Sequence, residues 1–265
     1  MHTPTLALLA VLLYLVACRM LAAHTSAGMA GSRNWLWPAV PAVLLHAAVH
    51  LLAWRALGGP QLHFYAALSV VGLGMAALST ALGPVQRIEA LGIIVYPLAA
   101  ATLLAYHFLG GGYAGEDLDW PLKLHALLAL LAYAALAVAT LLALMLWFQE
   151  RALRQRNIGV WLLVLPPLTQ LEMLLFRSLG ASFALLSLAL LTGVVFVDNL
   201  FGQHLVHKTV LSFLSWVVLA VLLFGRWRWG WRGPRAVKLT LTAMALLLLA
   251  FFGSKFVLEL VLHRG

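Results

Sequence analysis

Two histidines and a lysine stand close together in the segment 198–216, where a short polar stretch runs into an apolar one. His204 and His207 are three residues apart, and Lys208 follows directly. Neutral imidazole nitrogens bind haem iron, and they also suit soft divalent metals such as zinc and cobalt. This segment is therefore the first candidate for a site that holds a cofactor or a metal ion.

A third histidine, His125, lies one turn into the apolar segment 121–148, and His207 begins the apolar segment 206–224. Two helices that each offer one imidazole at the same depth can supply both axial ligands of a haem iron. The carboxylates of haem would then need basic partners on the same side of the membrane. The candidates are Lys208, Lys255, Lys123 and Arg55. The spacing also allows a plainer interpretation, in which these histidines are interfacial residues bonded to backbone carbonyls.

Two further pairs of ionisable residues lie in apolar segments at a spacing of one helical turn. His46 and His50 fall in the segment 37–57, where buried ionisable groups usually serve a function. They can pass a proton or bind a second haem or an ion, although hydrogen bonds between helices explain them equally well. Lys255 and Glu259 form the other pair. We expect them to make an ion pair, which lowers the cost of placing each charge near the membrane.

The composition excludes a soluble globular protein. Of the 265 residues, 64% are hydrophobic and only 9% are charged, and the mean hydropathy is +0.99. The net charge of +9 does not indicate nucleic-acid binding, because the basic residues lie between apolar segments, where they set membrane topology and meet anionic lipid headgroups. The one cysteine, Cys18, excludes disulfides within the chain. No hydrolase motif is present, so we predict no catalytic residue.

The predicted fold is an all-α integral membrane protein, a bundle of about eight transmembrane helices in a single domain, 1–265. A ninth segment, about 166–179, follows an apolar piece too short to span and contains Gln170 and Glu172. We therefore predict an interfacial amphipathic helix there. The predicted spans are 5–23, 37–57, 62–82, 88–109, 121–148, 181–197, 206–224 and 236–262.

The basic residues predict the orientation of this bundle. The two most basic connections, 149–157 and 225–238, belong on the cytoplasmic side. Eight spans place both connections there and put both termini outside, whereas a ninth span would separate the two connections. His125, His204 and His207 then lie at the outer face. The tryptophans and arginines of 227–232 are expected to anchor the protein among lipid headgroups.

Several strings of residues, taken in their order and spacing, resemble the cytochrome c assembly protein family. The similarity covers most of the chain and is closest to the CcsA-type proteins, in their HemX/YpjD-like branch. The strings that carry it are Leu124 to Tyr133, Pro166 to Glu172, Thr192-Gly193, His207-Lys208-Thr209 with Trp216, Gly230 to Gly233, and Phe252 to Lys255.

This resemblance implies a protein of cytochrome c biogenesis or haem trafficking that holds haem through histidines on the extracytoplasmic side. His125 and His207 match the family's histidine positions best. Haem lyases of the family carry a tryptophan-rich external segment with a Trp-Asp signature. The corresponding connection here, 198–207, contains no tryptophan, so the resemblance implies haem binding without a complete haem lyase.

From these observations we expect a bacterial inner-membrane protein that binds a non-covalent, b-type haem. His125 and His207 would be the axial ligands, with His204, Lys208 and Lys255 also in the site. The expected partners are haem, the lipid bilayer and other cytochrome c biogenesis proteins, and no nucleic acid. Two alternatives stay open. One is a transport component for cobalt or magnesium, which the scarcity of carboxylates in the spans disfavours. The other is a membrane scaffold or regulator of haem synthesis.

Overall fold

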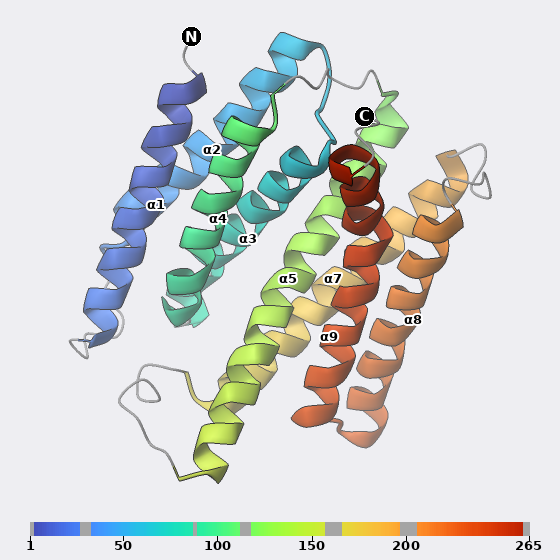
Figure 1. The fold of residues 1–265 in the computed structure, drawn as a ribbon. Coiled ribbons are helices and arrows are strands. Elements are labelled where there is room, and N and C mark those ends of the chain that lie inside the picture. Colours follow the sequence, from blue (N-terminus) through green and yellow to red (C-terminus); the bar gives the residue numbers. More distant parts are fainter. Residues whose placement is uncertain are drawn as a thin grey trace. The chain divides into compact units, whose positions relative to one another are not determined.

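The computed structural model describes residues 3–26, 33–86, 89–111, 118–156, 166–196 and 206–261. Every regular element within these ranges is a helix (Figure 1). Eight of the helices are long and apolar enough to cross a membrane. The predicted all-α membrane fold and the predicted number of spans are therefore confirmed.

The chain divides into two compact units, which are described separately. The N-terminal unit comprises Met1–Asp117 with Gly159–Pro166, and the C-terminal unit comprises Leu118–Ile158 with Pro167–Gly265. The single domain expected from the sequence stays a prediction.

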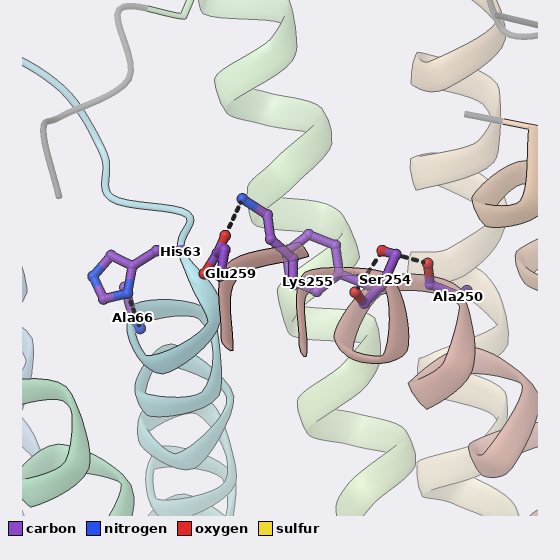
Figure 2. Close-up of polar contacts among 7 residues, drawn as sticks. His63, Ala66, Ala250, Ser254, Lys255 and Glu259 are labelled. Atoms are coloured by element: carbon purple, nitrogen blue, oxygen red, sulfur yellow. Dashed lines mark hydrogen bonds and ion pairs between the residues drawn. The ribbon is translucent and has the colours of Figure 1, made fainter. Parts of the chain in front are cut away.

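Four helices form the N-terminal unit, namely α1 (Thr3–Ser26), α2 (Leu36–Leu57), α3 (Phe64–Gln86) and α4 (Glu89–Leu109). Both α1 and α3 pack against α2 and α4 (Figure 1). Small buried residues such as Ala10 and Ala17 let the helix backbones approach closely. Helix α2 ends at Gly58, whose φ of 77° suits glycine. At the start of α3, Nδ1 of His63 accepts a hydrogen bond from the amide of Ala66 at 3.4 Å (Figure 2).

The C-terminal unit contains α5 (Trp120–Arg154), α7 (Leu168–Phe196), α8 (Val206–Trp229) and α9 (Pro234–Leu248). Helix α5 packs most extensively against α7, and α9 packs against α5 and α8. Two buried serines join neighbouring helices through backbone carbonyls, since Ser182 donates to Ala132 at 3.0 Å and Ser215 donates to Ala243 at 2.8 Å. Such bonds hold helices together where water cannot compete.

The last helix of this unit changes its winding after Leu248. Two π-helical segments follow α9, Leu249–Gly253 and Phe256–Val261. A π turn contains more residues than an α turn, so it rotates the side chains that follow it, and such turns are frequent at functional sites. The predicted span 236–262 therefore continues as helix to Val261, but with a different phase over its second half.

Helix α7 differs from the prediction. The sequence pattern predicts an interfacial helix over 166–179 and a separate span over 181–197, whereas the structure has one continuous helix, Leu168–Phe196. Gly180 does not break it, and space is open where its Cβ would lie. Glu172, whose charge favoured an interfacial position, lies 3.9 Å from the guanidinium of Arg232. The ion pair compensates the charge, so the helix does not need to leave the bundle at this point.

Candidate functional site

His125 projects from α5 against the backbone of α7. Its Nδ1 atom lies 2.8 Å from the carbonyl oxygen of Ala189 and 3.3 Å from the hydroxyl of Thr192. A carbonyl oxygen can only accept, so Nδ1 carries the hydrogen and donates it. In a neutral imidazole this leaves the lone pair on Nε2. The ring is thus held in the tautomer that offers Nε2 as a metal ligand.

Gly193 allows the His125 ring to lie this close to α7. A Cβ atom added at Gly193 would lie 3.1 Å from Cε1 and 3.4 Å from Nδ1 of His125. The first of these separations is tighter than an ordinary van der Waals contact, so any larger residue would push the imidazole away. Glycine at this position therefore sets the distance between the histidine ring and its carbonyl partner.

His125 lines a partly open, mainly apolar cavity of about 190 Å³ within the C-terminal unit. All four helices of the unit contribute to its walls. The other lining residues include Tyr133 of α5, Leu186, Leu190 and Val194 of α7, Lys208, Thr209 and Ser212 of α8, and Ala250 and Phe251 of the first π-helical segment. The cavity therefore combines an apolar wall with one imidazole and one primary ammonium group.

The π-helical segment places Phe251 beside the ammonium group of Lys208. The Nζ atom lies 5.9 Å from the centroid of the Phe251 ring, within the range of a cation–π interaction. Tyr133 and Leu247 also line this cavity. The hydroxyl of Tyr133 donates to the carbonyl of Leu247, which lies in the last turn of α9 before the winding changes. These contacts hold Lys208 at the cavity and satisfy a polar atom of its wall.

The sequence-predicted residues do not all meet at this cavity. The structure brings His125 and Lys208 together there. His207 is exposed and does not line the cavity, because it stands about 100° around α8 from Lys208. Lys255 binds Glu259 at 2.9 Å in the second π-helical segment, as expected from their spacing (Figure 2). His204 lies outside the described residues.

Four other predicted residues lie elsewhere. Lys123 lies in the first turn of α5 and does not line the cavity. Arg55 lies in the last turn of α2, in the N-terminal unit. His46 and His50 also belong to that unit, and both bond to the hydroxyl of Ser69. Within the ranges that the structure describes, no three His, Cys, Asp or Glu side chains gather as a metal site.

The groups that position His125 are not evident from the sequence pattern. Its partner is the main-chain oxygen of Ala189, which no side-chain pattern can reveal. Thr192 and Gly193 stand out as a polar and a small residue within an apolar span. That is the signal that could have identified this contact, because small residues mark close approach between membrane helices.

Comparison with known proteins relates this chain to a family. The family model for the cytochrome c assembly protein matches residues 37–262. Inner membrane protein YpjD of Escherichia coli K12 is 30% identical over 265 aligned residues, which cover 97% of this chain and 99% of that protein. An uncharacterized 28.8 kDa protein of Azospirillum brasilense is 38% identical over 154 residues, 57% of this chain and 55% of that protein.

A more distant relative carries a functional name. The cytochrome c biogenesis protein CcsA of Prochlorococcus marinus subsp. pastoris is 28% identical over 156 residues, which cover 51% of this chain and 50% of that protein. No solved structure gives a significant match. The family match spans most of the chain and the YpjD similarity spans nearly all of it, so this protein belongs to the cytochrome c assembly protein family.

Proposed function

We propose that this protein is an inner-membrane haem-binding protein that acts in cytochrome c assembly or haem trafficking, and that it is not a complete haem lyase. Family membership supports a role in cytochrome c biogenesis. The eight helices able to span a membrane and the similarity to the inner membrane protein YpjD support the location. The connection 198–207 contains no tryptophan, which supports haem binding without lyase chemistry.

The observation that carries this proposal is the tautomer of His125 at the apolar cavity. Histidines that bind metals almost always donate their other ring N–H to a carbonyl, a carboxylate or water. His125 makes this bond with Ala189 at 2.8 Å and lines a cavity that also contains Lys208. Haem needs an apolar wall, a nitrogen ligand for its iron and a cation for its carboxylates. The donor set of this cavity fits haem.

The size of the cavity limits how the haem is held. At about 190 Å³ it is smaller than the roughly 300–1,000 Å³ of typical ligand pockets. The cavity therefore accommodates part of the macrocycle, unless side chains move. Thioether attachment would require cysteine, and the one cysteine, Cys18, belongs to α1 of the N-terminal unit. We therefore propose a non-covalent, b-type haem.

The roles of the individual residues follow from their positions. His125 would bind the haem iron through Nε2. His207 would be the second ligand, with His204 as its alternative, and ligation would require the exposed His207 side chain to turn toward the cavity. Lys208 is the proposed partner of a haem carboxylate because it lines the cavity. Lys255 has a lesser part, since its ammonium group already binds Glu259.

We place this site at the extracytoplasmic face. The two basic connections approach each other at one end of the C-terminal unit, where Arg151, Arg154 and Pro234 line a common cavity and a Cβ at Gly233 would lie 2.9 Å from Glu150. Basic connections belong on the cytoplasmic side. His125 stands near the opposite end of α5, so it would face outward. Both termini would then be extracytoplasmic.

A haem titration of the purified protein tests the proposal. The apoprotein in detergent should bind haem with a saturable Soret absorbance at one haem per chain. The variant His107→Gln is the matched control, because His107 lies in α4 of the N-terminal unit, and it should bind haem as the wild type does. An absence of saturable binding would overturn the proposal. Co-purifying cobalt or magnesium without a Soret band would support the cation-transport alternative instead.

A further inference from the structure

A chain of hydrogen bonds crosses the interior of the N-terminal unit and joins α1, α2 and α3. The hydroxyl oxygen of Ser69 lies 2.9 Å from Nε2 of His46 and 2.9 Å from Nε2 of His50. The other ring nitrogen of His46, Nδ1, lies 3.2 Å from the hydroxyl of Tyr14. Tyr14, His46 and Ser69 are fully buried. The chain therefore runs Tyr14–His46–Ser69–His50 through an apolar interior.

The donors and acceptors of this chain can be arranged in two ways. A neutral imidazole has one donor and one acceptor nitrogen, and a hydroxyl has one hydrogen to donate. In the first arrangement Tyr14 donates to His46, His46 donates to Ser69, and Ser69 donates to His50. In the second arrangement every bond is reversed. Both arrangements satisfy all three hydrogen bonds, so the passage of one proton along the chain converts the first arrangement into the second without losing a bond.

Further groups extend the chain at both ends. On one side the ring of Tyr14 stacks on Tyr96 at 5.7 Å, and the hydroxyl of Tyr96 lies 3.1 Å from that of Thr80. On the other side the ring of His50 stacks on Tyr106 at 4.6 Å. The hydroxyl of Tyr106 donates to the side-chain carbonyl of Gln61 at 2.5 Å, in the connection between α2 and α3.

We propose that this chain is a proton relay through the N-terminal unit. Tyr14 passes its hydroxyl proton to Nδ1 of His46, Nε2 of His46 passes its proton to Ser69, and Ser69 passes its proton to Nε2 of His50. His50 then releases the proton on its Nδ1 to an entering water molecule, and a proton from water at the other end restores the hydroxyl of Tyr14. Each O–H or N–H bond that breaks is matched by one that forms. One proton enters and one leaves.

The ends of the chain make this relay slow. The contacts of Tyr14 with Tyr96 and of His50 with Tyr106 are ring-to-ring contacts. A proton crosses them only when a phenol ring turns or water enters. The relay therefore transfers protons far more slowly than an open channel. It does not depend on the proposed haem function, because all of its residues belong to the N-terminal unit.

Proton flux into vesicles tests the relay. The full-length protein would be reconstituted without haem in phosphatidylethanolamine–phosphatidylglycerol vesicles that contain a pH-sensitive dye. Valinomycin with a potassium gradient would supply an inside-negative potential. We expect internal acidification several-fold faster than in protein-free vesicles. The variants Ser69→Ala and Tyr14→Phe should both return the rate to that of protein-free vesicles, because each removes one hydroxyl from the chain.

The control is His107→Gln, which changes a histidine of the same unit outside the chain and should keep the wild-type flux. Tyr14→Phe retains the ring, so it preserves packing even if Ser69→Ala does not fold. Wild-type flux equal to that of protein-free vesicles would overturn the relay. Undiminished flux in a folded Tyr14→Phe variant would also overturn it, and the hydrogen bonds would then serve only to join helices. Loss of haem binding would leave these results unchanged.

Discussion

Nδ1 of His125 lies 2.8 Å from the carbonyl oxygen of Ala189, on the neighbouring helix α7. Because the carbonyl belongs to the main chain, no side-chain substitution at Ala189 can remove it. The bond fixes both the tautomer and the orientation of the imidazole.

Gly193→Ala should weaken haem binding. The added methyl group would lie 3.1 Å from Cε1 of His125, so the ring must move by a few tenths of an ångström away from Ala189. Changes to the partners of a metal-binding histidine typically lower affinity by about 10-fold or more. Haem titration followed at the Soret band measures this loss. Gly180→Ala is the control in the same helix, since its Cβ meets open space, and equal affinities for both variants would contradict the prediction.

Lys208→Met should weaken the binding of haem but not of haem dimethyl ester. The ester lacks the carboxylates that the ammonium group is proposed to bind. Losing a hydrogen bond to a charged group lowers affinity by about 10-fold. Parallel titrations with haem and its ester measure the difference, and Lys208→Arg should keep most of the affinity for haem. If Lys208→Met weakened both ligands equally, the residue would act through its packing against Phe251.

His207→Ala should change the coordination of the iron while leaving haem bound. If His207 is the second axial ligand, the variant loses the six-coordinate low-spin spectrum and shows a five-coordinate high-spin one. His125, the proposed first ligand, would still hold the haem. Absorption and electron paramagnetic resonance spectra distinguish the two states. A low-spin spectrum that persists in His207→Ala but disappears in His204→Ala would transfer the role to His204.

Gly225→Ala should destabilise the turn between α8 and α9. A Cβ at Gly225 would overlap the indole ring of Trp231, and overpacking of this kind costs about 1–3 kcal/mol. Unfolding in mixed detergent, followed by circular dichroism, measures the change. Glu172→Gln is a useful comparison, because it keeps the side-chain volume and removes one charge of a pair whose Arg232 side chain is 66% exposed, so it should cost less than Gly225→Ala. A Gly225→Ala variant as stable as the wild type would refute the packing argument.

The sequence predicts the number of spans because each apolar run is long enough to cross a bilayer. It fails at α7, because the ion pair that accommodates Glu172 comes from Arg232, sixty residues further along the chain. Local polarity cannot reveal such a partner. The predicted break near residue 180 is also absent. Gly180 continues the helix, and there is open space where its Cβ would lie.

The lining of this cavity could be predicted only in part from the sequence. The sequence identifies His125 as a candidate because it is a polar residue at the start of an apolar helix. It does not show that Ala189 provides the partner carbonyl. At α8 the sequence singles out His207, but the phase of the helix places Lys208 at the cavity. One residue changes the direction by about 100°, and only the packed structure determines which side chain faces inward.

The Soret absorbance of His125→Gly, measured with and without free imidazole, tests the central claim most directly. The substitution removes the proposed axial ligand and leaves space for imidazole beside Ala189. We predict that haem binding falls sharply in the variant, and that added imidazole restores the Soret band. Undiminished haem binding in His125→Gly without imidazole would contradict the assignment of His125 as the ligand.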